Sequence, residues 1–140
     1  MEIKVVTTQD EREDAYYVRL KVFVEEQQVD VEEEIDQYEE EATHLVVYDE
    51  GKPVGAGRLR VVDGYGKMER ICVMPSHRQA GVGKLIMNKM ESLAVDKGLS
   101  KLKLHGQTHA EGFYEKLGYV TVSGEIMDAG IPHVNMVKKL

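Results

Sequence analysis

The stretch from Met68 to Gly83 contains the residues whose types and spacing point to chemistry. It reads MERICVMPSHRQAGVG, which is a short apolar strand, a loop carrying Gly81 and Gly83, and then an apolar helix. Glycines let a ligand approach the backbone, and the first turn of a helix presents N–H groups without intrahelical partners. Because the helix dipole is positive at this end, the pattern predicts an anion site, most naturally for a phosphate or pyrophosphate. This stretch alone leaves open a tight connection that binds nothing, since short glycine motifs also occur by chance.

The elements that must position this loop belong to a single domain over residues 1–140, which is long enough to bury a core. No segment has 18 consecutive apolar residues, so we expect no membrane span. The N-terminus lacks a basic region followed by an apolar run, so we expect no secretory signal. The single cysteine, Cys72, cannot form an internal disulfide, and the cytoplasm is the expected compartment.

Charge is unevenly distributed along the chain. The net charge is −7, but residues 25–41 hold ten of the 25 acidic groups and no Lys or Arg. An acidic total argues against nucleic acid as a partner, which requires a basic footprint. We expect the acidic run from Glu25 to Glu41 to be a solvated surface loop, with one helical turn around Ile35 and Tyr38. The alternative is a negative rim that attracts a cationic amine. Arg19, upstream of this run, is expected to be solvated or structurally paired.

Periodicity predicts an α/β fold. Thr8 and Glu11 have capping-box spacing and mark a helix start after a first edge strand. Residues 44–48 and 53–62, with the strand after Asp63-Gly64, predict an antiparallel meander, in which Gly55 and Gly57 indicate a bulge or a close backbone approach. The helix after Gly83 and the strand at 100–105 imply a parallel pair with a right-handed crossover. A short helix at 109–118 and a final antiparallel pair, 119–123 with 134–138, complete the chain, with Asp128–Pro132 as a loop.

Two motifs at a defined separation carry a resemblance to a known family. Arg78-x-x-Gly81-x-Gly83 follows a strand, and Ala110-x-x-Phe113-Tyr114-x-x-Leu117-Gly118-Tyr119 comes one helix and one strand later. Their order and spacing resemble the GNAT N-acetyltransferase superfamily over nearly the full chain. The stretches Arg19–Gln27 and Gly130–His133 resemble its small bacterial YjcF and ElaA-type branch. The resemblance implies a mixed, mostly antiparallel sheet of six to seven strands with about four helices, splayed between the fourth and fifth strands.

The resemblance also implies acetyl-CoA as co-substrate, bound in that splay without a metal. Its pyrophosphate would lie on the backbone N–H groups of Gln79, Ala80, Gly81, Val82, Gly83 and Lys84, which agrees with the anion site argued above. Arg78 and Lys84 are expected either to add positive charge or to be solvated. The pantetheine arm would pair like an added strand beside Ile71, Cys72 and Val73. Gln107 replaces the asparagine that many members use to contact this arm, and its amide offers the same donor and acceptor types.

The implied reaction moves acetyl from the thioester to an amine, and three groups are needed. The developing oxyanion needs a donor, for which the backbone N–H near Cys72 or Val73 is the candidate. Tyr114 is the expected general acid for the leaving thiolate, or else an aromatic that packs on the arm. Glu69 is the expected base through water, or else a partner in an ion pair, and His133 is the other candidate for the base. The roles of His105 and His109 stay undecided.

Cys72 lies beside the expected thioester, which raises the possibility of an acyl-cysteine. Buried cysteine is commonly a small core residue, and reactivity would require a cation that lowers its pKa, so we expect direct transfer. The acceptor is a small-molecule or protein amine, and a homodimer is possible. A non-catalytic acyl-CoA-binding module is the competing function. A dinucleotide-binding domain is disfavoured because G-x-G-x-x-G spacing is absent after the first strand.

Overall fold

One mixed sheet runs through the computed structural model, which describes residues 1–140. The strands lie in the order β1-β2-β3-β4-β5-β8-β6, and β7 pairs with β8. Only the β4–β5 pair is parallel, so the predicted mixed α/β fold is confirmed, with eight strands in place of six to seven. The strands are β1 (Glu2–Val5), β2 (Thr43–Asp49), β3 (Lys52–Val62), β4 (Tyr65–Val73), β5 (Lys101–Gln107), β6 (Val120–Thr121), β7 (Ile126–Asp128) and β8 (Ile131–Lys139).

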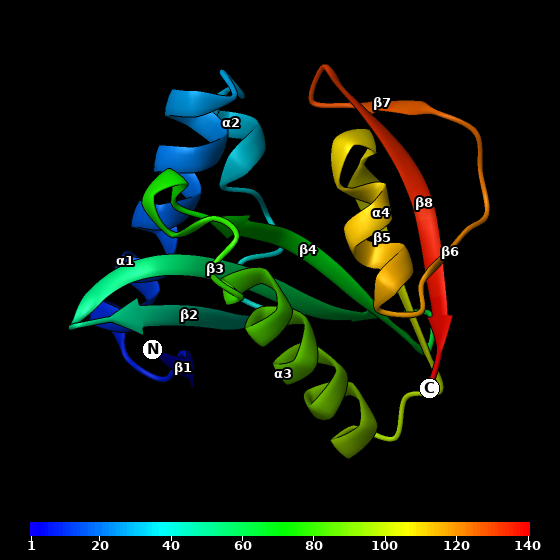
Figure 1. Cartoon of the computed structure of the whole chain (residues 1–140). Coiled ribbons are helices and arrows are strands. Elements are labelled where there is room, and N and C mark those ends of the chain that lie inside the picture. Colours follow the sequence, from blue (N-terminus) through cyan, green and yellow to red (C-terminus); the bar gives the residue numbers. More distant parts are fainter.

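Four α-helices cover the two faces of the sheet (Figure 1). They are α1 (Gln9–Arg19), α2 (Val31–Glu34), α3 (Val82–Asp96) and α4 (Glu111–Lys116). A π-helix, η1 (Leu20–Glu26), continues α1, and the 3-10 turns η2 (Pro75–His77) and η3 (Thr108–Ala110) precede α3 and α4. None of these helices has the length and apolar character needed to cross a membrane.

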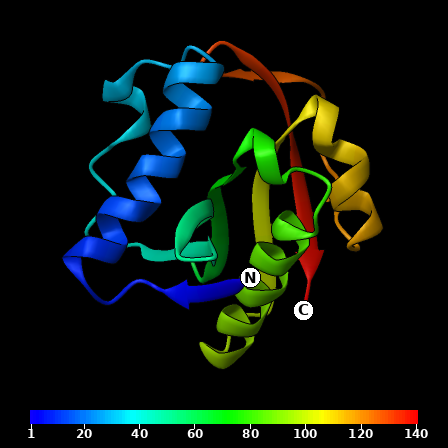
Figure 2. The same cartoon turned by 60° about the vertical axis from the view of Figure 1, so that its left-hand side comes forward.

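Two cores lie on opposite sides of the strands. Figure 2 shows α1 on one side and α3 and α4 on the other. The larger core packs α3 and Tyr114 against residues such as Leu59, Leu102 and Met136, and the smaller one packs α1 against Val46, Ala56 and Cys72. The predicted capping box starts α1, because Thr8 Oγ1 accepts from Glu11 N–H and the Glu11 carboxylate accepts from Thr8 N–H. Because the two cores lie on opposite faces of the sheet, alternate side chains of each strand point to opposite sides of the splay.

The predicted meander of β2, β3 and β4 is confirmed, and its glycines allow α3 to lie close to the sheet. A Cβ at Gly57 would come within 2.5 Å of the Met90 Cε atom, and one at Gly55 within 2.6 Å of Val82 Cγ1. The β3–β4 register also shifts here, where Gly57 lies opposite Arg70 and Ile71. Arg70 has φ of 58°, so this is a β-bulge in β4. Both predicted meanings of the glycines, a bulge and a close approach, therefore hold.

The sheet splays between β4 and β5. Their parallel pairing comprises Gly66–Leu102, Lys67–Lys103 and Met68–Leu104, and it ends there. Figure 1 shows the two strands diverging from the end of the sheet near the C-terminus. The second half of β4, from Glu69 to Val73, therefore has a partner only in β3. This leaves an open strand edge inside the molecule, as the family resemblance implied.

The prediction that the acidic run is a solvated loop is wrong for its central residues. Glu34 and Glu39 are only 3% and 5% exposed, and both bind the guanidinium of Arg19, which is itself buried. The turn of helix also lies earlier than predicted, at Val31–Glu34. The run reads as solvated because the arginines that neutralise it stand far away in the sequence.

The end of the chain contains a hairpin that the sequence reading did not separate. The predicted final pair is confirmed, since β6 pairs with β8 through Val120–Val137 and Thr121–Met136. Asp128 and Ile131, however, already pair across a two-residue turn, so β8 begins at Ile131. Ala129 and Gly130 have φ of 52° and 77°, which suits a type I′ hairpin turn.

Candidate active site

A row of unpaired backbone donors lies between η2 and α3. The N–H groups of residues 79–84 donate to no acceptor within the chain, and the first helical bond of α3 runs from Leu85 N–H to Gly81 O. Gly81 is the N-cap of α3, has φ of 84°, and has open space where a Cβ would stand. Free N–H groups at a helix N-terminus bind anions. The predicted residues Gln79 to Lys84 therefore form one continuous loop and first turn with donors available for a phosphate.

The two cations predicted beside this loop differ. Lys84 is exposed and forms no ion pair, so its charge is free for an anion. Arg78 instead donates both Nη atoms to the carboxylate of Glu26, at 2.6 and 2.5 Å, which lowers the pKa of Glu26. Arg78 Nε also donates to Val73 O at 3.1 Å. Arg78 thus ties the loop to the end of η1 and to β4.

The open edge of β4 presents the backbone of Ile71, Cys72 and Val73. Met74 N–H donates to Val54 O on the β3 side at 2.8 Å. Because neighbouring N–H groups of a strand point in opposite directions, Val73 N–H points away from β3 and toward the splay. The N–H group predicted as oxyanion donor therefore faces the splay. The bulge at Arg70 lies three residues before it.

Tyr114 is buried on the α4 side of the splay, with its ring against the backbone of Gly106. A Cβ at Gly106 would lie 3.0 Å from the Tyr114 ring, so any larger residue there would push the ring away. Its hydroxyl forms no hydrogen bond within the chain, yet it is not among the fully buried polar atoms, of which only His44 Nδ1 lacks a partner. Burial raises the pKa of Tyr114 to about 12, so the phenol keeps its proton at neutral pH.

Cys72 and Tyr114 belong to different cores, Cys72 to the one under α1 and Tyr114 to the one under α3. The Cys72 side chain is almost fully buried in the core under α1. Desolvation raises the pKa of its thiol, which keeps it in the unreactive form. These features favour the interpretation of Cys72 as a core residue.

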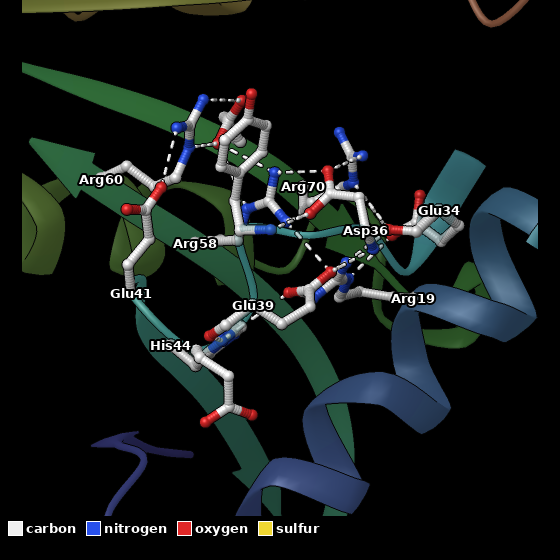
Figure 3. Close-up of polar contacts among 12 residues, drawn as sticks. Arg19, Glu34, Asp36, Glu39, Glu41, His44, Arg58, Arg60 and Arg70 are labelled. Carbon is white, nitrogen blue, oxygen red and sulfur yellow. Dashed lines mark hydrogen bonds and ion pairs between the residues drawn. The ribbon is translucent and has the colours of Figure 1, made fainter. Parts of the chain in front are cut away.

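Glu69 lies in a cluster of ion pairs on the α1 side of the sheet. Its arginine partners Arg58 and Arg60 are labelled in Figure 3. Its Oε1 accepts from Arg58 at 2.9 Å and from Arg60 at 2.7 Å, and its Oε2 lies 3.4 Å from Lys67 Nζ. These cations outweigh burial and lower the pKa of Glu69. A carboxylate held in this way is a weak base, so its contacts favour the ion-pair interpretation over the catalytic one.

The same cluster fastens the acidic run to the sheet. We call it the arginine–carboxylate cluster; its members are Arg19, Glu34, Asp36, Glu39, Glu41, Arg58, Arg60, Glu69 and Arg70. Arg58 is fully buried and binds Asp36, Glu39 and Glu69 at 2.8 to 3.0 Å. Because all its central carboxylates are paired, the cluster does not provide the negative rim considered from the sequence.

Gln107 lies at the end of β5, where the splay is widest, and binds Gln27. Its Nε2 donates to Gln27 Oε1 at 2.8 Å, and Gln27 Nε2 donates back at 3.3 Å. Glu26 and Gln27 thus contact both sides of the splay, through Arg78 and Gln107. Neither was predicted as a site residue, although both stand in the Arg19–Gln27 stretch that resembles the YjcF and ElaA-type branch.

The three histidines left open are separated by the structure. His109 is exposed and contacts Gln107 at 2.7 Å. His105 and His133 lie on the α1 side of β5 and β8, where His105 Nδ1 is 3.4 Å from Asp128 Oδ2. His133 Nδ1 lies 2.6 Å from Ile131 O. Asp128 was read only as part of a loop, and the Ala-Gly turn signal that follows it is what could have placed it on a hairpin.

Comparison with known proteins defines the class. The family model of the acetyltransferase (GNAT) domain matches residues 7–140, and this chain therefore belongs to the GNAT acetyltransferase family. It is 54% identical to YjcF of Bacillus subtilis strain 168, an uncharacterized N-acetyltransferase, over 99% of this chain and 99% of that protein.

Solved structures agree with the predicted fold. Escherichia coli ElaA superposes with a TM-score of 0.86 at 22% identity, covering 98% of both chains. An aminoglycoside 6′-N-acetyltransferase complexed with coenzyme A superposes with a TM-score of 0.80 at 18% identity, covering 99% of this chain and 97% of that one.

Proposed function

We propose that this chain is an acetyl-CoA-dependent N-acetyltransferase that moves acetyl directly from the CoA thioester to a primary amine. The observation that carries the proposal is the continuity of free donors from the open edge of β4 to residues 79–84 at the start of α3. A nucleotide thioester needs both, since its pyrophosphate is an anion and its arm carries amides. The aminoglycoside acetyltransferase that shares this fold was solved with coenzyme A.

The donor half would be held by the predicted residues. The N–H groups of Gln79 to Lys84 and the free charge of Lys84 suit the pyrophosphate. The backbone of Ile71 to Val73 suits the arm, which would satisfy the unpaired edge as an added strand does. Arg78 would release Glu26 and bind a phosphate of the cofactor instead. Gln107 would release Gln27 and bind an amide of the pantetheine arm.

In the transfer step the amine nitrogen forms a bond to the carbonyl carbon, and the bond from that carbon to sulfur breaks. Val73 N–H would donate to the carbonyl oxygen while it carries negative charge. Tyr114 would give its proton to the departing sulfur, because its hydroxyl is unpaired and stays protonated at neutral pH. Cys72 has no role in this scheme.

The first experiment separates a transferase from a binding module. Calorimetric titration with acetyl-CoA should show stoichiometric binding, and adding a panel of primary amines should release free thiol, detected with a thiol reagent. Mass spectrometry should then find one acetyl group on the accepted amine. Tight binding without thiol release across small-molecule and peptide amines would instead identify an acyl-CoA-binding module. No binding would refute the assignment of the site.

The remaining expectations extend this proposal. A single buried cysteine suits the cytoplasm. A homodimer is also proposed, and sedimentation would measure it.

A further inference from the structure

A cluster of two histidines and one aspartate lies on the α1 side of β5 and β8. Leu102 and Leu104 of β5 face the core under α3, so His105 faces the opposite side, toward α1. Met136 of β8 likewise faces that core, which places His133 on the same side as His105. The β7–β8 hairpin brings Asp128 over them, with its Oδ2 3.4 Å from His105 Nδ1. We call His105, Asp128 and His133 the histidine–aspartate cluster.

His133 is arranged as a proton acceptor. Its Nδ1 lies 2.6 Å from the carbonyl oxygen of Ile131, and a carbonyl only accepts, so Nδ1 carries the proton. In the neutral ring Nε2 therefore holds a lone pair. Nε2 has no hydrogen-bond partner within the chain and is not fully buried, although His133 as a whole is only 8% exposed. A neutral imidazole with one nitrogen fixed and the other free is the form that a base requires.

Asp128 is a negative charge on this side that no arginine holds. Glu34, Asp36, Glu39 and Glu69 are all held by arginines, whereas Asp128 contacts no Lys or Arg. The hydrogen bond from His105, and the nearby charges of His133 and Arg70, lower its pKa and keep it ionised. Its side chain is half exposed, so a cation can reach it. The two-residue turn at Ala129-Gly130 fixes its position relative to His133.

We propose that the histidine–aspartate cluster is the acceptor subsite and takes a cationic primary alkylamine. This inference rests on the proposed acetyl transfer and names its acceptor class. Asp128 binds the ammonium group, and His133 Nε2 removes one proton to give the neutral amine. His105 positions Asp128 through its Nδ1–H. After the nitrogen–carbon bond forms and the carbon–sulfur bond breaks, the nitrogen loses its second excess proton to solvent, and sulfur gains one from Tyr114. His133 then releases its proton to solvent, and solvent reprotonates the tyrosinate.

The test compares isosteric variants on defined amines. The acceptors are n-butylamine, 1,4-diaminobutane and a lysine peptide, with aniline as an amine that is already neutral at pH 7. His133→Asn keeps a donor for Ile131 O but removes Nε2. It should lower kcat for the alkylamines roughly 10²-fold and leave aniline transfer nearly unchanged.

Asp128→Asn should raise KM for alkylamines roughly tenfold at similar kcat, because a charged hydrogen bond to the ammonium is lost. Asp63→Asn, in the distant β3–β4 turn, is the matched control and should change neither constant. In every variant acetyl-CoA affinity should stay at the wild-type value.

Two results would overturn the subsite. One is transfer of acetyl to aniline but to no alkylamine, in wild-type protein that binds acetyl-CoA. The other is an unchanged kcat in His133→Asn, or equal losses with aniline and alkylamines. Binding of acetyl-CoA without transfer to any amine, or absence of binding, would instead contradict the proposed function itself.

Discussion

Tyr114 differs from the other buried tyrosine of its core in having no partner for its hydroxyl. The Tyr119 hydroxyl donates to Glu91 at 3.0 Å, whereas the Tyr114 hydroxyl contacts no polar group of the chain. The Tyr114 hydroxyl is not fully buried, although its ring lies in the core, so a bound substrate can reach it. The environment of this one atom is what favours an acid over a packing role.

Replacing Tyr114 by Phe tests that role. We expect kcat for the accepted amine to fall roughly 10²-fold while acetyl-CoA affinity changes little, because the ring packing on Gly106 is kept. Steady-state thiol release and calorimetry measure the two quantities. An unchanged kcat in a folded variant would remove Tyr114 from the mechanism.

Cys72→Ala tests direct transfer. The thiol is buried and its pKa is raised, so we expect kcat to stay within about twofold of wild type. The variant should lose about 1 kcal/mol of stability from reduced core packing, measured by urea denaturation. Detection of an acetylated Cys72 in rapidly quenched wild-type protein would contradict direct transfer.

At the scale of elements, we expect one added negative charge to stop the whole loop before α3 from binding phosphate. Gly81→Asp adds a carboxylate among the free N–H groups of residues 79–84, where phosphate would lie. We expect acetyl-CoA affinity to fall at least about 100-fold, since the new anion both repels phosphate and takes its donors.

Gly64→Asp is the control for the strain of this change. Gly64 has φ of 82° and open space at its Cβ position, as Gly81 does, but it lies in the β3–β4 turn. It should lose similar stability and keep its affinity. Equal affinities for the two variants in calorimetry would show that the phosphate-loop assignment is wrong.

The elements themselves were largely predictable, and the reason is local. The capping box at Thr8, the Asp63-Gly64 turn and the free N–H groups before α3 each depend on neighbouring residues. The partners of the acidic run were not predictable, because Arg58 and Arg70 are 22 and 34 residues from Asp36. For the same reason the sequence left Glu69 open between base and ion pair, and only the fold puts Arg58 and Arg60 against it.

At the scale of the whole molecule, the arginine–carboxylate cluster makes stability depend on pH. Desolvation raises the pKa of Glu39, but the hydrogen bonds and charge of Arg19 outweigh it. The result is a pKa of about 2, lowered from an ordinary 4.5. A folded-state pKa below the unfolded one means that this stabilisation is full above about pH 4.5 and is lost toward about pH 2. Asp36 and Glu69 act in the same direction, whereas burial raises the pKa of Glu34 and opposes them.

We therefore expect acid unfolding in this range, followed by circular dichroism. Glu39→Gln removes the charge that faces Arg19 and Arg58, so it should cost roughly 3 kcal/mol at pH 7 and flatten the loss of stability between pH 4.5 and 2. Arg12 pairs with exposed Glu40 at 2.7 Å, so Glu40→Gln is the matched control and should cost under about 1 kcal/mol. Equal losses in the two variants would mean that the buried pairs do not set the acid limit.

The π-helix η1 has a consequence for how the molecule is assembled around the splay. Its turns are wider than those of an α-helix, and they end with Gln27 N–H donating to Val22 O. The width of these turns sets the direction in which Glu26 and Gln27 leave the helix axis of α1. Since each helical residue turns by about 100°, deleting Glu25 would restore α-helical winding and rotate both side chains away from Arg78 and Gln107. The π-helical winding of η1 thus determines that Glu26 reaches Arg78 and Gln27 reaches Gln107.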